Sequence, residues 1–168
     1  MNRFWRRGLF RTVLTVLAAV ALLPLSTATG SAAEADFVEC SKGSLSVRVD
    51  TVTRAVTGTG NVSQCVAQVN FELTSATITV SGTATQLAGL LVSTVTTETI
   101  RWNNGQTTTV TVQRSYFGTS SVSAVGTGNT TGGVLHPAGE FDNGNGTRRN
   151  NGGSVTLTNA VQLIMAAS

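Results

Sequence analysis

The chain has 168 residues, only 11% of them charged and 5% aromatic, and a formal net charge of +3 at pH 7. Four arginines stand before residue 12, whereas residues 34–168 hold seven Lys and Arg against eight Asp and Glu, a net charge of −1. The basic character therefore belongs to the N-terminus, and the rest of the chain gives no basis for nucleic acid as a partner.

The first 35 residues are typical of a secretory signal peptide. Residues 1–11 are basic and residues 12–25 are apolar. As a helix, the apolar run would reach about 21 Å, short of the roughly 30 Å of a bilayer core. Small residues follow, which predicts cleavage after Ala33 or Ala35. We expect residues 1–35 to be removed, leaving no stable membrane anchor, and residues 36–168 to form a single secreted domain.

Two export routes stay open. The segment Arg6-Arg7-Gly8-Leu9-Phe10-Arg11 resembles a twin-arginine signal. The long apolar run, with no basic residue behind it, favours the general secretory route.

Cys40 and Cys65 are the only cysteines in the chain. In an oxidising compartment such a pair predicts a disulfide, which here closes a loop of about 25 residues and contributes about 3 kcal/mol in the chain-entropy model. No Cys-x-x-Cys spacing is present, which argues against a redox role.

From residue 36 onward the composition predicts β-structure. Thr, Val, Ser and Gly dominate, and no segment of twelve residues carries an uninterrupted helical pattern of apolar positions. Several segments alternate apolar and polar residues, as expected of strands with one buried face. These segments are 45–50, 76–81, 121–124 and 155–158, and an apolar final strand is expected over 160–165.

Segments rich in Gly and Asn are interpreted as the turns between these strands. They are residues 57–61, Gly82, Gly89, 103–105, 126–129 and 143–146. Their spacing predicts about eight to ten short strands joined mostly by hairpins, and hence an all-β, antiparallel fold. We expect a β-sandwich, with a closed or partly open β-barrel as the alternative.

The turn at residues 103–105 can be predicted in more detail. A two-residue loop would split the flanking apolar residues across both faces of the hairpin, whereas a three-residue loop with Gly105 in the left-handed conformation places them on one face. We predict the three-residue loop, with Trp102 opposite Gln106, because burial of the apolar row outweighs the small difference between turn types.

Candidate catalytic groups are few. His136 is the only histidine, and no Gly-x-Ser-x-Gly motif is present. Glu140 and Asp142 would share one face of a strand, but a glycosidase also needs an aromatic-lined cleft, and the aromatic residues are too few to build both a cleft and a core. We assign no catalytic residue.

Residues 140–146, Glu-Phe-Asp-Asn-Gly-Asn-Gly, have some features of a calcium loop. Glycines stand where further ligands are needed and no acidic residue follows, so a turn is the simpler interpretation. Histidines and thiolates are too few for zinc or copper. We expect no metal and no cofactor.

Sugar binding requires exposed aromatic side chains, and Trp102 and Tyr116 are the pair that the sequence offers. Both carry even numbers, as do the apolar residues of the hairpin around residues 103–105. We therefore predict that both belong to the core and are not available to a sugar.

The assembled pattern resembles a group of small exported proteins of actinobacteria. The shared features are the Arg-rich signal, an early Cys before an alternating strand, a second Cys about 25 residues on, a Thr-rich meander and the segment Ile100-Arg-Trp-Asn-Asn-Gly-Gln-Thr107. The resemblance covers most of the chain after the signal. It implies an extracellular β-sandwich and carries over no catalytic residue.

These features together predict a secreted, non-enzymatic extracellular domain whose partner is a cell-wall or extracellular glycan or a protein. The alternative is a small secreted hydrolase or a calcium-dependent glycan-binding protein that uses Glu140, Asp142 and His136. Convergence of these three side chains on one concave pocket would favour the alternative.

Overall fold

The computed structural model describes residues 37–68 and 72–167, so the predicted signal peptide lies outside the described residues. Nine strands and no helix occupy these ranges, as the composition predicts. The strands are β1 (Phe37–Asp50), β2 (Ala55–Ala67), β3 (Ser75–Ala88), β4 (Leu91–Trp102), β5 (Thr107–Phe117), β6 (Ser121–Gly133), β7 (Ala138–Asn150), β8 (Ser154–Ala160) and β9 (Gln162–Ala167). Within the same ranges, no helix is long and apolar enough to cross a membrane.

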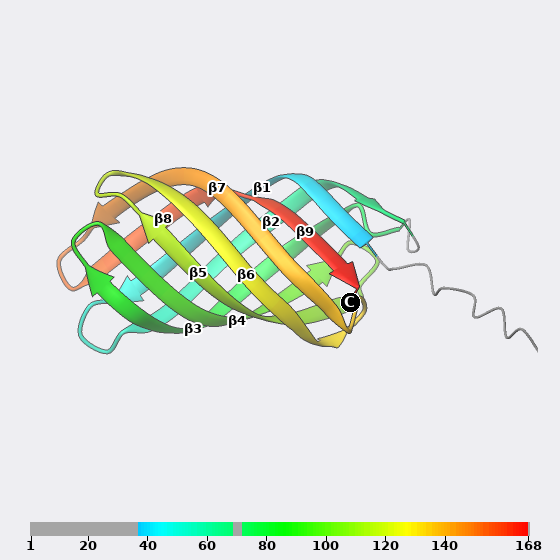
Figure 1. The fold of residues 1–168 in the computed structure, drawn as a ribbon, viewed down its shortest axis with the longest axis horizontal. Coiled ribbons are helices and arrows are strands. Elements are labelled where there is room, and N and C mark those ends of the chain that lie inside the picture. The colour runs from blue at the N-terminus through cyan, green and yellow to red at the C-terminus, as the bar shows by residue number, and fades with distance from the viewer. Residues whose placement is uncertain (1–36, 69–71, 168) are drawn as a thin grey trace, which may run out of the picture. The chain divides into compact units, whose positions relative to one another are not determined.

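Consecutive strands pair antiparallel from β1 to β8, and the sheet then closes on itself (Figure 1). β8 and β9 share one position in the sheet, because each of them pairs with β7 on one side and with β1 on the other. The nine strands therefore fill eight positions of a closed, up-and-down β-barrel.

The expected sandwich is wrong, and the barrel that was the alternative is the observed fold. A sandwich leaves edge strands in each of its sheets, whereas β1 here bonds to β2 and also to β8 and β9, so the ring of strands has no edge. The two architectures share the same alternation of buried and exposed residues. For that reason the sequence pattern could not separate them.

The hairpin between β4 and β5 has the predicted three-residue loop. The backbone N–H of Trp102 donates to the Gln106 carbonyl at 2.9 Å, and the N–H of Gly105 donates to the Trp102 carbonyl at 2.9 Å. Gly105 has a φ of 85°, in the left-handed region. The apolar residues of both strands consequently face the same side, where Ile100 and Val110 are buried.

Four of the six predicted turns instead lie inside strands, while Gly89 and residues 103–105 are turns as predicted. Residues 57–61 belong to β2, Gly82 to β3, 126–129 to β6 and 143–146 to β7. The glycines are explained by close approach between strands: a Cβ at Gly82 would lie 2.2 Å from the carbonyl oxygen of Val95. Glycine at alternate positions of a strand thus permits tight packing in a closed sheet.

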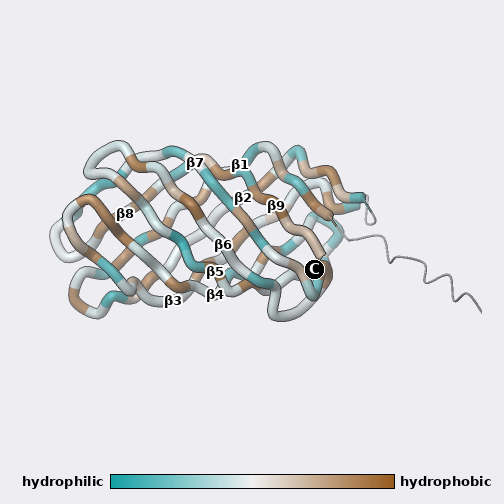
Figure 2. Tube along the Cα trace, in the orientation of Figure 1, coloured by the Kyte–Doolittle hydropathy of each residue, from teal (hydrophilic) through white to brown (hydrophobic). Residues whose placement is uncertain are grey.

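The barrel interior is filled by side chains from all nine strands. Hydrophobic and hydrophilic segments alternate along the tubes in Figure 2, in keeping with one inward and one outward face per strand. The largest fully buried side chains are Trp102, Tyr116, Leu45, Leu73, Ile100, Leu157 and Met165. An eight-stranded barrel has an interior just wide enough for such side chains.

Cys40 and Cys65 are directly opposite each other on β1 and β2, with their Sγ atoms 2.04 Å apart, a disulfide distance. Both side chains point into the barrel and are buried. The bond closes a sequence separation of 25 residues. It therefore ties the first hairpin together from inside.

Gly82→Ala should lower the free energy of unfolding by about 1–3 kcal/mol, because the added Cβ has to displace the backbone of β4. Gly132→Ala is the matched control on β6, since a Cβ at Gly132 meets no atom within 4 Å. The control should change stability by less than about 0.5 kcal/mol. Urea denaturation followed by circular dichroism measures both values, and equal effects would contradict the close-approach explanation.

Candidate functional site

Four ionisable side chains meet inside the barrel. Glu98 on β4, Arg114 on β5 and Glu140 and Asp142 on β7 all point inward, with exposed fractions of 3%, 2%, 5% and 0%. Glu140 and Asp142 do share one face of a strand, as the sequence spacing indicated, and the intervening Phe141 points outward and is 40% exposed.

Arg114 is the centre of this buried cluster. Its Nε lies 3.0 and 3.1 Å from the two carboxylate oxygens of Asp142, and its Nη2 also donates to Asp142. Its Nη1 donates to Glu98 Oε1 at 2.5 Å. Thr96 Oγ1 donates to the same oxygen of Glu98 at 3.2 Å. Such charge-assisted, multidentate bonds are needed to offset the cost of removing these charges from water.

Two glycines of β6 make room for the carboxyl groups of β7. Gly126 pairs with Asp142 and Gly128 pairs with Glu140. A Cβ at Gly126 would lie 2.3 Å from Asp142 Oδ2, and one at Gly128 would lie 2.9 Å from Glu140 Oε2. Residues 126–129, for which a turn was predicted, are therefore the part of β6 against which the acidic side chains pack.

The cluster holds three carboxyl groups for one guanidinium, and one of them keeps its proton. Burial, together with the neighbouring Asp142 charge and a hydrogen bond to Asp142, raises the pKa of Glu140 to about 9. Burial alone would lower the pKa of Arg114, but the adjacent Glu98 and Asp142 outweigh it and raise that pKa well above its usual value. Near neutral pH the carboxyl group of Glu140 is therefore neutral and Arg114 is a cation.

The residues of the alternative hydrolase do not converge on one pocket. His136 is exposed in the loop before β7, where its Nδ1 lies 3.0 Å from the Thr130 carbonyl oxygen and 3.1 Å from Thr130 Oγ1. Glu140 and Asp142 are instead buried inside the barrel. A substrate that touched the imidazole would not reach the two carboxyl groups.

The calcium-loop interpretation of residues 140–146 does not match the structure, because these residues lie within β7. Among the described residues, no group of three His, Cys, Asp or Glu side chains is arranged to hold a metal ion. Trp102 and Tyr116 are 2% and 1% exposed, which confirms that both belong to the core. The Trp102 indole N–H donates to Thr108 Oγ1 at 2.9 Å.

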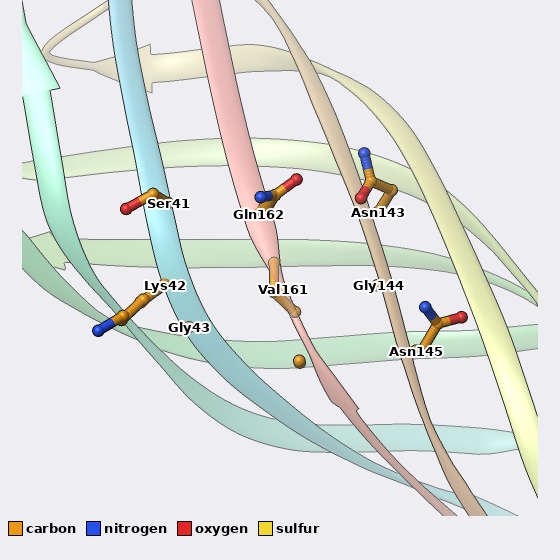
Figure 3. A pocket seen from close by; sticks show the side chains of 9 residues that line it. Ser41, Lys42, Gly43, Asn143, Gly144, Asn145, Val161 and Gln162 are labelled. Atoms are coloured by element: carbon orange, nitrogen blue, oxygen red, sulfur yellow. The ribbon is translucent and has the colours of Figure 1, made fainter.

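A hollow of about 540 Å³ opens on the outer face of the barrel, over β1, β7 and the junction of β8 and β9 (Figure 3). Its volume lies within the roughly 300–1,000 Å³ typical of small-ligand sites. The lining residues are Ser41, Lys42, Gly43, Asn143, Gly144, Asn145, Ala160, Val161 and Gln162. None of them is acidic.

A change of register in β1 accounts for the position of this hollow. Ser44 pairs with Ala160 on β8, whereas Cys40 pairs with Leu163 on β9. Between these two pairs the chain advances by four residues on β1 and by three residues on β8 and β9. Such an extra residue is a β-bulge, which leaves part of the ladder unpaired and bends the strand. Ser41 and Lys42, two neighbouring residues at this point, are both exposed.

The lining side chains carry unused hydrogen-bonding groups. Asn143 and Gln162 are directly opposite each other on β7 and β9, and Asn145 follows two residues along β7. None of these three amides bonds to another described side chain or backbone group. By contrast, Asn103 Oδ1 accepts hydrogen bonds from the backbone N–H groups of Thr74 and Ser75. The hollow therefore presents free amides on the outer side of the barrel, whereas the cluster of Glu98, Arg114, Glu140 and Asp142 lies inside it.

This site was not expected from the sequence, because the Asn and Gly residues at 143–146 indicated a turn. Asn143 and Asn145 alternate with Gly144 and Gly146, which is the period of a strand with polar side chains outside and glycine inside. Gln162 belongs to the predicted apolar final strand, in which it is the one polar side chain that faces outward beside β7.

Comparisons of this chain with protein-family models, with curated proteins and with solved structures found no match. The resemblance to exported actinobacterial proteins accordingly stays a prediction.

Glu140→Gln should remove a pH dependence of stability. Between the ordinary glutamate pKa of 4.5 and about 9, the folded chain keeps a proton that the unfolded chain releases. The free energy of unfolding therefore falls as pH rises through this window, by up to about 1.4 kcal/mol per pH unit, and the neutral Gln abolishes that contribution. The urea midpoint of unfolding, recorded from pH 5 to pH 9, measures this pH dependence of stability. Glu39→Gln changes an exposed carboxyl group and should keep the wild-type slope; a wild-type slope in Glu140→Gln would contradict the neutral assignment.

Arg114→Met should lower the free energy of unfolding by about 3–5 kcal/mol at pH 7, since it leaves two buried carboxylates without a counterion. Arg48→Met is the control on the outer face of β1, with an expected change of less than about 0.5 kcal/mol. Chemical denaturation at pH 7 measures both values, and equal losses in the two variants would contradict the role assigned to the buried ion pairs.

Proposed function

We propose that this chain is an exported, non-enzymatic β-barrel that acts by binding a partner through its outer surface. The partner is a component of the cell wall, an extracellular glycan or an extracellular protein. The outer hollow over β1, β7, β8 and β9 is the binding site.

The observation that carries the proposal is the contrast between the two faces of β7. On the inner face, Asp142 is bound to Arg114 and Glu140 is held neutral, so both are occupied within the barrel. On the outer face, Asn143 and Asn145 line an open hollow with free amides. A catalytic group has to touch its substrate, whereas the buried cluster is closed to substrate by the barrel wall.

Export is supported by the three-part layout of residues 1–35. The two cysteines at disulfide distance fit an oxidising compartment, where such bonds persist. The outward side chains of the barrel are mostly Thr, Ser and Asn, a neutral polar surface suited to extracellular contact rather than to nucleic acid.

The full-length chain, expressed in a bacterium, should appear in the extracellular fraction without its leader. Intact-mass spectrometry should find an N-terminus at Glu34 or Asp36, and thiol labelling before and after reduction should find the cysteines blocked. A chain that stays in the cells with Met1 and two reactive thiols would contradict the proposal. Replacing the apolar residues 16–20 by charged residues is the control that should abolish export.

A further inference from the structure

Three outward-facing rows cross from β7 to β8 and β9 at the hollow. Phe141 pairs with Ile164 in the first row, Asn143 pairs with Gln162 in the second, and Asn145 and Ala160 line the hollow beside them. Residues two apart on a strand lie on the same face, roughly 6.5–7 Å from each other. An apolar row with an exposed aromatic ring therefore borders directly on a row of amides.

The amide row offers both hydrogen-bond donors and acceptors. Each Asn or Gln side chain presents one carbonyl oxygen and one NH₂ group in a single plane. Figure 3 shows the amides of Asn143 and Gln162 between β7 and β9, whereas the Ser41 hydroxyl on the neighbouring strand points away from them and donates to Gln64. The pair of amides fits a ligand that has several hydroxyl groups along its edge.

The aromatic row offers a flat apolar surface. Phe141 is 40% exposed although it is a large hydrophobic residue, and Ile164 beside it is half-buried. The face of an aromatic ring carries partial negative charge, which attracts polarised C–H groups. A pyranose ring has an apolar C–H face and a hydroxyl-bearing edge, so it can contact both rows at once.

The side chains of Asn143 and Gln162 are uncharged and suit a neutral ligand. No acidic residue lines the hollow, and Lys42 is the one cationic residue of the lining. In Figure 3 the Lys42 side chain points away from Gln162 and Asn143. Glu39 pairs with Ile164 at the edge of the apolar row, where it would repel an acidic sugar.

We infer that Phe141, Asn143 and Gln162 form a binding site for a neutral pyranose unit of a glycan. Phe141 packs against the C–H face of the ring, and the two amides bond to hydroxyls at its edge. The inference rests on the proposed function, and it names the ligand class of the same site. It also assigns the sugar-contacting aromatic residue to Phe141 rather than to the buried Trp102 or Tyr116.

The test is isothermal titration calorimetry of the protein, recovered from expression of the full chain, with three probes. Cellohexaose and chitohexaose are neutral, and an oligomer of polygalacturonate is acidic. Binding of at least one neutral probe and no binding of the acidic one is expected. Phe141→Ala, Asn143→Ala and Gln162→Ala should each raise the Kd at least about tenfold, which corresponds to about 1.4 kcal/mol.

Two matched controls lie elsewhere on the outer face. Phe117→Ala removes an aromatic ring that is 51% exposed, and Asn129→Ala removes an exposed amide in another hollow. Both should leave the Kd unchanged, and all five variants should keep the wild-type melting temperature by circular dichroism. Binding that both sets of variants weaken equally would overturn the site.

The remaining outcomes are also decisive. No heat with either neutral probe, or preferential binding of the acidic oligomer, would overturn the assignment of a neutral sugar. The proposed function fails separately, if the full chain is retained in the cells with its leader. If the protein is processed, folded and extracellular but binds neither neutral probe, the sugar inference is overturned and the proposed function is not.

Discussion

The guanidinium of Arg114 lies between carboxylates from two different strands in the middle of the barrel. It holds Glu98 on β4 and Asp142 on β7, and β5 itself has β4 and β6 as its neighbours in the sheet. Because β4, β5 and β7 lie within four consecutive positions of the ring, the ion pairs join this side of the barrel from the inside. A buried charge without its partner is strongly destabilising, so every strand that contributes to the cluster depends on the others.

The same cluster explains the unusual composition of the neighbouring strands. Carboxyl groups inside a narrow barrel need space, and β6 supplies it with Gly126 and Gly128 opposite Asp142 and Glu140. The proton on Glu140 removes one negative charge that Arg114 could not balance. Packing and protonation are thus two parts of one solution to the problem of burying four polar side chains in an apolar core.

The strand content and the hairpin at residues 103–105 could be predicted, because both follow from local alternation and turn geometry. Barrel closure could not, since the pairing of β1 with β8 and β9 joins segments more than a hundred residues apart. The buried pair Glu140 and Asp142 could be placed on one face from their spacing. Their partner Arg114 could not, because nothing local connects it with β7. The outer amides were missed because Asn and Gly favour turns when considered singly, while their period of two favours a strand.

The pairing of β1 with the last two strands has a further consequence for how the polypeptide reaches its native state. During synthesis β1 is made first, and its second neighbour is complete only when residue 167 has been added. Until then β1 carries a free edge that can pair with another chain. The ring closes only with β9, so assembly of this barrel cannot be completed before residue 167 has been added, and it then has to overcome the loop entropy of one long-range contact.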